Sequence, residues 1–307
     1  MSRHAANSAI SPLAVVILNW NLPYDTIACI ESLQVGLPEG VRIVVVDNAS
    51  TDGSVRILRS RFSELVEIIE NDRNLGFAGG VNAAIRQLLV DGVRSIFFLN
   101  NDTVVSPDLL KQLIRTAETK TGAGIVGPVI YYHADPGRIW RFGDREHPWL
   151  PFIYPLSASF LARHSREPFQ VSYTTGCGML VRSEVFEHVG LFDERYFMYF
   201  EDADFCRRVR QAGFEIWVDP LADMWHKVSL SSKNEKPQMR YYQSWGRARF
   251  YWSDPSIVRR WFSAIYIFAR AVWITTKDCF NREWRLVQPT WLGTTEGLFG
   301  RPVRNLA

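Results

Sequence analysis

Three runs of apolar residues, each ending in Asn or Asp, constrain the fold of this 307-residue chain more than any other feature. The runs are Val15–Asn19, Val44–Asp47 and Phe97–Asp102. Near-continuous apolar runs of this length are typical of strands that are buried on both faces of a parallel sheet. In an open α/β sheet, ligands bind in a crevice outside the carboxyl ends of the strands. The sequence therefore predicts a sheet that delivers polar groups to one ligand-binding edge.

Strand and helix patterns alternate through the first 130 residues, which predicts an α/β fold. We expect strands at Leu13–Asn19, Arg42–Asp47, Val66–Glu70 and Ser95–Leu99, and helices at Asp25–Gln34, Phe77–Leu89 and Pro107–Lys120. Ser106 is the expected N-cap of the last helix, and Gly122 follows its end. This alternation favours a mostly parallel central sheet that is flanked by helices.

The second half of the chain is less regular. Residues 131–170 contain five prolines and predict an irregular or short-stranded insert. We then expect a strand at Met179–Arg182, a helix at Glu201–Gly213 and a strand at Glu215–Asp219. The predicted domains are a catalytic unit over residues 1–250, with halves 12–130 and 131–250, and a helical extension over residues 251–307.

Residues 256–276 predict an amphipathic helix. Its apolar face contains Val258, Trp261, Ile265, Phe268 and Val272, and Arg259, Ser263 and Arg270 share the opposite face. Two interpretations are nearly equal. The apolar face packs on the catalytic body or on a second subunit of a homodimer, which is slightly favoured, or it lies in a membrane interface.

Charge is distributed unevenly along the chain. Residues 1–226 carry a net charge of −6, and residues 227–307 carry +9. Such a basic, aromatic tail attracts anionic lipid or nucleic acid, and the absence of any known reader motif argues against nucleic acid. The four cysteines form no close pair, so neither a zinc knuckle nor a redox motif is indicated. The polar segment 1–12 lacks an apolar signal core, so we expect a cytoplasmic protein, peripheral at the membrane in the second interpretation of the tail.

Two segments of the first half have the composition of nucleotide-binding turns. Asp47 ends a strand and could accept the imide N–H of uracil or thymine, although an Asp that caps the next helix is the commoner reason for this pattern. Residues 74–82 form a Gly-rich helix start whose amides can face phosphate. The segment lacks the Walker lysine and the dinucleotide spacing, which disfavours a P-loop ATPase and a Rossmann dehydrogenase.

Carboxylates at two further positions suggest a metal site and a catalytic base. Asp102, after the fourth strand, could hold Mg²⁺ or Mn²⁺ together with a substrate diphosphate, and His226 could be a second ligand. Each has a structural alternative, a turn for Asp102 and a packed core histidine for His226. Glu201, Asp202 and Asp204 follow an aromatic turn, and a carboxylate held against apolar rings has a raised pKa that suits a general base. The alternative is that these acids only cap a helix.

The ordered set of motifs resembles the family 2 glycosyltransferases, most closely the rhamnosyltransferase-like branch. The resemblance runs from about residue 12 to about 250 and is carried by the segments 15–21, 44–54, 74–84, 98–103, 175–181, 190–195 and 201–204. It implies a GT-A fold and transfer of a sugar from a nucleotide diphosphate donor with inversion. The best match for the donor is dTDP-L-rhamnose, with a UDP-sugar, galactofuranosyl or hexosyl, as the near alternative. The implied acceptor is a glycan or a polyprenyl-linked glycolipid.

The resemblance also implies roles for single residues. Asp202 matches the catalytic base, and Asp102 and His226 match the metal ligands. The nucleotide-binding set is Asn19, Asp47, Asn74, Gly79, Gly80, Asn82 and Asn101, and the acceptor set is Gly176, Cys177, Gly178 and Glu201. Where the family's metal motif has paired acids, this chain has Asn100-Asn101-Asp102 with a single carboxylate.

Two readings from other classes compete with this one. A sugar nucleotidyltransferase would need basic residues after the first strand, where this chain has Asn19-Trp20-Asn21-Leu22-Pro23. A non-catalytic glycan-assembly scaffold would have no need of the intact acids. The glycosyltransferase reading requires that Asp47, Asp102 and Asp202 converge on one cleft.

Overall fold

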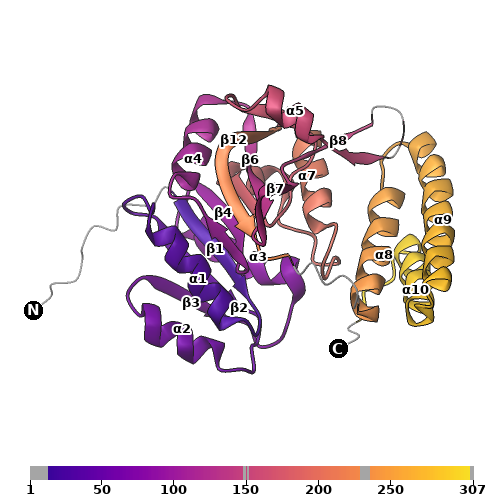
Figure 1. Ribbon diagram of the computed structural model, residues 1–307, viewed down its shortest axis with the longest axis horizontal. Coiled ribbons are helices and arrows are strands. Elements are labelled where there is room, and N and C mark those ends of the chain that lie inside the picture. Colours follow the sequence, from indigo (N-terminus) through magenta and orange to yellow (C-terminus); the bar gives the residue numbers. More distant parts are fainter. Residues whose placement is uncertain (1–12, 148–149, 151, 229–235, 305–307) are drawn as a thin grey trace, which may run out of the picture.

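The computed structural model describes residues 13–147, 150, 152–228 and 236–304. Segment 1–12, for which we expected no export signal, lies outside the described residues. Figure 1 shows an α/β body with a bundle of three helices, α8 (Pro237–Trp252), α9 (Ile257–Phe280) and α10 (Val287–Leu298), at one side. A short 3-10 helix, Trp284–Leu286, connects α9 to α10.

A ten-stranded sheet forms the centre of the body, in the order β10-β12-β6-β11-β4-β1-β2-β3. The strands β1 (Leu13–Asn19), β2 (Arg42–Asp47), β3 (Val66–Glu70) and β4 (Ser95–Asn100) are parallel neighbours. Antiparallel β11 (Gly178–Arg182) then joins β4 to β6 (Ala123–Tyr132), which is parallel to β12 (Glu215–His226). Short β5 (Thr103–Val105) pairs with β12.

Helices cover both faces of this sheet, as the apolar runs predict. Val16 and Phe98 belong to one buried cluster, while their neighbours Val15 and Phe97 belong to a cluster on the other face. The covering helices of the body are α1 (Pro23–Gln34), α2 (Ser54–Phe62), α3 (Gly76–Val90), α4 (Leu109–Thr119), α6 (Ser183–Val189) and α7 (Glu201–Gln211). The predicted fold class, a helix-flanked α/β sheet with a C-terminal helical extension, is confirmed.

The proline-rich insert consists of short elements, as expected. They are β7 (Asp135–Arg141), β8 (Asp144–Glu146), β9 (Ile153–Pro155), α5 (Ala158–Arg163) and β10 (Phe169–Val171). Of these, β7 pairs with β6 and β10 pairs with β12 in the large sheet, while β8 and β9 form a separate two-stranded sheet.

Two local predictions are wrong. Ser106 does not cap α4, because its amide donates to the carbonyl of Asp223 on β12 and the helix begins only at Leu109. The strand expected to end at Asp219 continues to His226, because the ladder absorbs Pro220 in a register shift between Val218 and Asp223 and then resumes.

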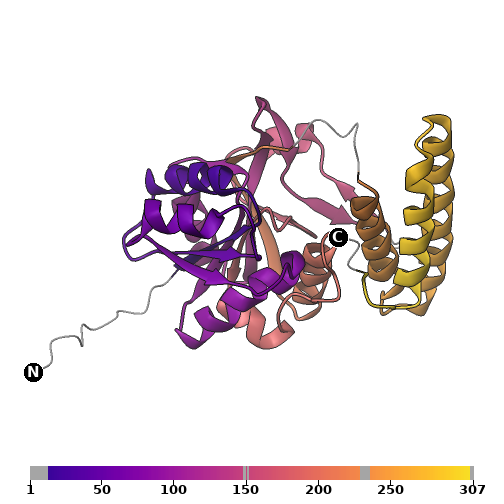
Figure 2. The ribbon, with the colours of Figure 1, turned by 90° about the horizontal axis from the view of Figure 1, so that it is seen from below.

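The helical bundle is attached to the body through α8. Figure 2 shows α8 between the body and the pair formed by α9 and α10. Gly293 and Gly297 let α10 approach α8 closely, since a Cβ at either position would lie 2.4 Å from a backbone oxygen of α8. Because α8 packs with α9 and α10, we propose a domain boundary near residue 236 instead of 250.

Helix α9 turns its apolar face to solvent, so in the described chain this face is not packed on the catalytic body, while packing on a second subunit stays a prediction. Trp261, Ile265 and Phe268 are each more than 60% exposed, whereas Ser263 from the predicted polar face is fully buried. Among the described residues, no helix is long and apolar enough to cross a membrane.

Candidate active site

The carboxyl ends of β1 and β2 are joined by a buried polar network. Asn19 and Asp47 are register partners, and Asn19 Nδ2 donates to Asp47 Oδ1 at 2.7 Å and to Ser50 Oγ at 3.1 Å. The second oxygen of Asp47 accepts from the Ser50 amide at 2.8 Å. Asp47 is only 2% exposed, so in this structure it organises the loop that follows β2 instead of presenting a free carboxylate.

The Gly-rich segment serves close packing. Gly76 has a φ of +70°, and a Cβ there would lie 2.0 Å from the carbonyl oxygen of Phe197. A Cβ on Gly80 would lie 2.5 Å from Leu18 on β1. These contacts bring the start of α3 against both the sheet and the loop that precedes α7.

The amides at the start of α3 are already paired. Asn74 Oδ1 accepts from the Gly76 amide at 2.9 Å, and the Phe77 amide donates to the Phe197 carbonyl. Gly79 and Gly80 lie further inside the helix. A side chain at Gly79 would meet Leu75 and one at Gly80 would meet Leu18, so close packing explains these two glycines, and their contact with a diphosphate stays a prediction.

The side chain of Asn82 is also occupied by hydrogen bonds within the fold. Its amide donates to the Phe192 carbonyl at 2.9 Å and to Glu194 at 3.0 Å, and it accepts from the Phe192 amide. The side chain is 1% exposed. Asn82 thus connects the first half of the body to the loop before α7.

Asp102 and His226 face each other at the end of β4. His226 Nε2 lies 3.0 Å from Asp102 Oδ1 and 3.1 Å from Oδ2, because β12 pairs with β5 and brings residue 226 opposite Thr103. Asn101 donates to Thr26 at 3.0 Å, and Thr26 donates to Asn19. The metal candidates are therefore connected to the Asn19–Asp47 network.

One carboxylate and one imidazole within 3.0 Å of each other fit Mg²⁺ or Mn²⁺, ions that usually keep water ligands and bind substrate phosphates. The Asp102 side chain is 30% exposed, which leaves coordination positions open to solvent. Within the described residues, no group of three or more His, Cys, Asp and Glu forms a complete metal site. The chemistry of the pair therefore suits an ion that is shared with a bound ligand.

Asp202 is held by backbone amides of two segments. Its Oδ2 accepts from the Gly176 amide at 3.1 Å, and its Oδ1 accepts from the Ala203 amide at 2.8 Å. A Cβ on Gly176 would lie 3.0 Å from the ring of Phe77, so the glycine lets this turn pack closely against the start of α3. No side-chain cap is present at the start of α7, whose N-cap residue is Phe200. Asp202 is thus not the residue that caps the helix.

The neighbouring Glu201 is the buried acid of the pair. Burial raises the pKa of Glu201 well above its usual range, and the charge of Asp202 adds to this effect. Its Oε2 has no hydrogen-bond partner among the described residues. Just before it, Tyr199 and Phe200 have φ values of +71° and +72°, a left-handed backbone that is costly for residues other than glycine.

Residues 175–178 connect the two acidic centres. The Cys177 carbonyl accepts from the Asn100 amide at 3.0 Å, next to the metal candidates, while the amide of Gly176 binds Asp202. Burial raises the pKa of Cys177, and the charges of both Asp102 and Asp202 act in the same direction. Asp102 and Asp202 therefore lie on either side of one turn.

The sequence model of the family described as Glycosyl transferase family 2 matches residues 14–190, more than half of the chain. This span contains the Asn19–Asp47 network, Asp102 and the Gly176 turn.

The chain is a family 2 glycosyltransferase.

Curated relatives agree with this assignment and include rhamnosyltransferases. This glycosyltransferase is 31% identical over 224 residues to the N-acetylglucosaminyl-diphospho-decaprenol L-rhamnosyltransferase of Mycobacterium tuberculosis, covering 66% of this chain and 71% of the relative. It is 25% identical over 298 residues to the low-salt glycan biosynthesis hexosyltransferase Agl10 of Haloferax volcanii, covering 95% and 92%. It is 27% identical to the dTDP-rhamnosyl transferase RfbF of Shigella flexneri, covering 66% and 67%.

Solved structures give the fold. The glycosyltransferase GalNAc-T7, crystallised with UDP, GalNAc and Mn²⁺, matches with a TM-score of 0.65 at 16% identity, over 83% of this chain and half of that one. The mannosyltransferase PcManGT of Pyrobaculum calidifontis, in complex with GDP-Man and Mn²⁺, matches with a TM-score of 0.60 at 13% identity, over 94% and 87%. The glycosyltransferase therefore has the GT-A fold that its motifs implied.

Several polar and aromatic residues near the site had no predicted role. Lys227 follows His226, and its Nζ donates to Asp25 at 2.7 Å while its amide donates to the Asp102 carbonyl. Trp20 is 51% exposed beside Asn19, at the carboxyl end of β1. Position after a strand end was the signal that could have identified both.

A second pair, Arg141 and Asp144, had no usable signal because it comes from the irregular insert. Arg141 donates to Asp144 Oδ2 at 2.5 Å. Burial raises the pKa of Asp144, the charge of Arg141 lowers it, and the charge of Asp202 raises it further. The glycosyltransferase thus has, on the insert side of Asp202, a buried carboxylate that is paired with an exposed arginine.

Proposed function

We propose that this glycosyltransferase moves L-rhamnose from dTDP-L-rhamnose to a hydroxyl of a glycan or polyprenyl-linked acceptor, as one step of cell-surface polysaccharide synthesis. The observation that carries the proposal is the link from Asp102 through Cys177 and Gly176 to Asp202. It brings the proposed metal ligand and the proposed base to one turn, an arrangement that supports transfer from a sugar diphosphate.

In the proposed mechanism, Asp202 removes the proton of the acceptor hydroxyl while the hydroxyl oxygen attacks the anomeric carbon. The bond from that carbon to the diphosphate breaks in the same displacement, which inverts the configuration. The amides of Gly176 and Ala203 hold the Asp202 carboxylate in position for this task. A divalent cation held by Asp102 and His226 would offset the charge of the departing diphosphate.

The donor is the least constrained part of the proposal. Relatives named for rhamnosyl transfer support dTDP-L-rhamnose, and the match to a hexosyltransferase over nearly the whole chain supports a UDP-sugar as the alternative. A thermal-shift comparison of dTDP, UDP, ATP and NAD separates these cases. Greater stabilisation by dTDP than by UDP is expected, and a preference for ATP or NAD would contradict the proposal.

The Asp202→Asn variant tests the mechanism. It keeps the shape of the side chain but loses the basic carboxylate, so donor binding should remain while turnover falls by about 10²–10⁴-fold. Single-turnover kinetics and donor titration measure the two effects, and Asp204→Asn is the control because Asp204 is paired with Arg208. Near-wild-type turnover in Asp202→Asn would show that the base is another residue.

We further propose that the protein is cytoplasmic and lies on the inner face of an anionic membrane through the exposed face of α9. The net charge of +9 in residues 227–307 and three exposed tryptophans, Trp261, Trp273 and Trp284, support lipid as the partner. A relative named for a decaprenol-linked acceptor supports the same placement.

A further inference from the structure

Every acid in the described part of the helical bundle has an arginine partner. The pairs are Asp254 with Arg259, Asp278 with Arg240, Glu283 with Arg285, and Glu296 with Arg304. The remaining cations of the bundle therefore have no carboxylate of the bundle to neutralise them.

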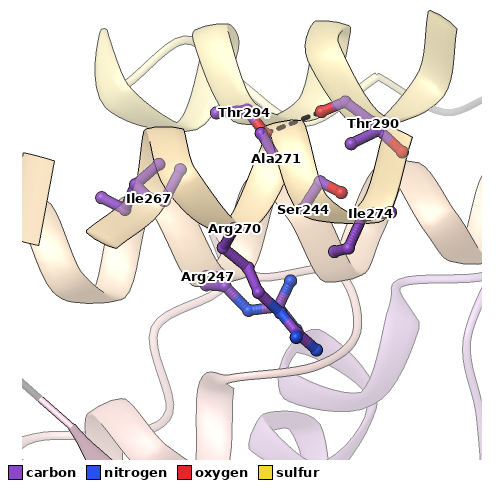
Figure 3. Close-up of a pocket in the computed structure, with 9 residues that line it drawn as sticks. Ser244, Arg247, Ile267, Arg270, Ala271, Ile274, Thr290 and Thr294 are labelled. Atoms are coloured by element: carbon purple, nitrogen blue, oxygen red, sulfur yellow. Dashed lines mark hydrogen bonds between the residues drawn. The ribbon is translucent and has the colours of Figure 1, made fainter. Parts of the chain in front are cut away.

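Two of these cations, Arg247 of α8 and Arg270 of α9, lie close together beside one small cavity. Figure 3 shows both side chains extending to the side of the helices away from Thr290 and Thr294, and the positive charge of Arg270 acts on Arg247. Both line a cavity of about 10 Å³ between the three helices, which has room for about one water molecule. Neither guanidinium group makes a hydrogen bond or an ion pair with a side chain that the structure describes. The guanidinium of Arg247 lies over the ring of Phe200, and that of Arg270 lies over the ring of Trp273.

Two adjacent guanidinium groups without a counter-ion are unfavourable in a partly buried position. Burial lowers the pKa of Arg247 below the usual range of arginine, and the positive charges of Arg270 and Arg240 act in the same direction. An anion between the groups would remove this cost, and arginine forks match phosphate oxygens. The cavity is too small for phosphate, so the anion would bind at the guanidinium ends.

This pair of arginines lies next to the turn at residues 196–200, which directly precedes Glu201 and the proposed base Asp202. The Arg247 guanidinium carbon is 5.7 Å from the centre of the Phe200 ring, and Phe200 directly precedes Glu201 and Asp202. A Cβ on Gly246 would lie 2.7 Å from the Tyr199 carbonyl oxygen, so α8 contacts the same turn with its backbone.

We propose that Arg247 and Arg270 bind the phosphate groups of a lipid-linked acceptor, a sugar attached through a diphosphate to an isoprenoid chain. The sugar hydroxyl would then reach Asp202, and the isoprenoid would continue toward the apolar face of α9. The inference rests on the proposed function and specifies its acceptor class.

Binding of farnesyl diphosphate to the full chain tests this site. The titration is done in detergent with EDTA and without donor, so that a metal-bound diphosphate at Asp102 does not contribute. Arg247→Gln and Arg270→Gln should each weaken binding by about tenfold or more, because each removes charge-assisted hydrogen bonds. Arg285→Gln, which removes an equal charge from an exposed site, should bind like wild type.

Thermal unfolding provides a second readout. Without ligand, Arg247→Gln should be at least as stable as wild type, since it relieves repulsion between like charges. Farnesyl diphosphate should raise the melting temperature of wild type but not of this variant. These results do not depend on sugar transfer, so they stand apart from the outcome of Asp202→Asn.

Unchanged binding of farnesyl diphosphate in both variants would overturn the proposal. So would variants that bind farnesyl diphosphate normally but lose affinity for phosphatidylglycerol vesicles, because the arginines would then bind lipid headgroups.

Discussion

Glu201 and Asp202 are adjacent carboxylates in opposite environments. Asp202 accepts two amide hydrogen bonds beside the Gly176 turn, whereas Glu201 is 7% exposed with an unpartnered oxygen. The sequence argument that apolar rings raise the pKa of an acid here applies to Glu201, because it is Glu201 that the fold buries. We therefore interpret Glu201 as a neutral group beside the proposed base.

Glu201 should make the protein less stable as pH rises. Its folded pKa is raised above the ordinary value of 4.5, so the folded state holds a proton that the unfolded state releases. The free energy of unfolding should fall by about 1.4 kcal/mol for each pH unit from about pH 5 up to the folded pKa. Glu201→Gln should abolish this slope in urea titrations between pH 4 and 8.

The control for this experiment is Glu194→Gln, because the pKa of Glu194 is shifted in the opposite direction from that of Glu201. Hydrogen bonds from Asn82 and Arg86 lower the pKa of Glu194, so its contribution is present above the unfolded pKa and is lost as pH falls. The control should lose stability at neutral pH. A wild-type slope that persists in Glu201→Gln would show that Glu201 is not protonated in the folded protein.

Asp102 and His226 allow a prediction about metal binding that does not depend on turnover. Mn²⁺ together with UDP or dTDP should raise the melting temperature of wild type, and Asp102→Asn or His226→Ala should weaken the Mn²⁺ dependence by about tenfold or more. Glu118→Gln, an exposed acid on α4, should behave like wild type. Equal Mn²⁺ effects in all four proteins would remove these residues from the metal site.

At the scale of elements, helix α8 and the turn at residues 196–200 form one packed unit. Tyr196 stacks edge-on to Trp245, and Phe197 packs on Tyr242. The left-handed Tyr199 and Phe200 lie directly against Gly246. The packing of α8 therefore holds the strained backbone that positions Glu201 and Asp202.

Gly246→Ala should disturb catalysis through this contact. The added Cβ would meet the Tyr199 carbonyl, shift the turn and lower kcat by about tenfold to a hundredfold, while the KM for donor stays near wild type because the donor half is untouched. Ser244→Ala is the matched control, since it removes a buried, unpartnered hydroxyl from the same helix. Wild-type kcat in a folded Gly246→Ala protein would contradict the coupling.

On the scale of the whole molecule, the bundle contacts the catalytic body through α8 and exposes the apolar face of α9 to solvent. Deleting residues 255–307 is not a clean test of membrane binding, because it would also uncover the Tyr241 and Trp245 side of α8. Point substitutions on α9 avoid that damage.

Ile265→Glu and Phe268→Glu should reduce sedimentation with phosphatidylglycerol vesicles by about tenfold or more, since each places a charge in the apolar interface. Val90→Glu, an exposed apolar residue on the body, should sediment like wild type. Sedimentation velocity on the same proteins tests the alternative, in which a second copy of the chain covers the apolar face of α9. A concentration-dependent dimer that these substitutions abolish, with vesicle binding unchanged, would show that α9 contacts a second copy of the chain.

The strands of the first half and the polar groups at their ends could be predicted from the sequence. The bounds of β1 and β2 were predicted to the residue, because continuous apolar runs that end in polar groups have few alternatives once a sheet must be covered on both faces. The bounds of β3 were also predicted to the residue, although its run is less apolar. Asp102 and Asp202 were singled out by residue type and order along the chain.

Tertiary structure alone decided which side chains are free. Asp47 and Asn82 are occupied by internal hydrogen bonds, Glu201 is buried while Asp202 is not, and α9 exposes its apolar face in place of packing it on the catalytic body. Periodicity tells which residues share a face, but the direction of that face depends on contacts between segments distant in sequence. For the same reason, the proximity of Arg247 and Arg270 could not be predicted from the sequence, because it depends on the packing of α8 against α9.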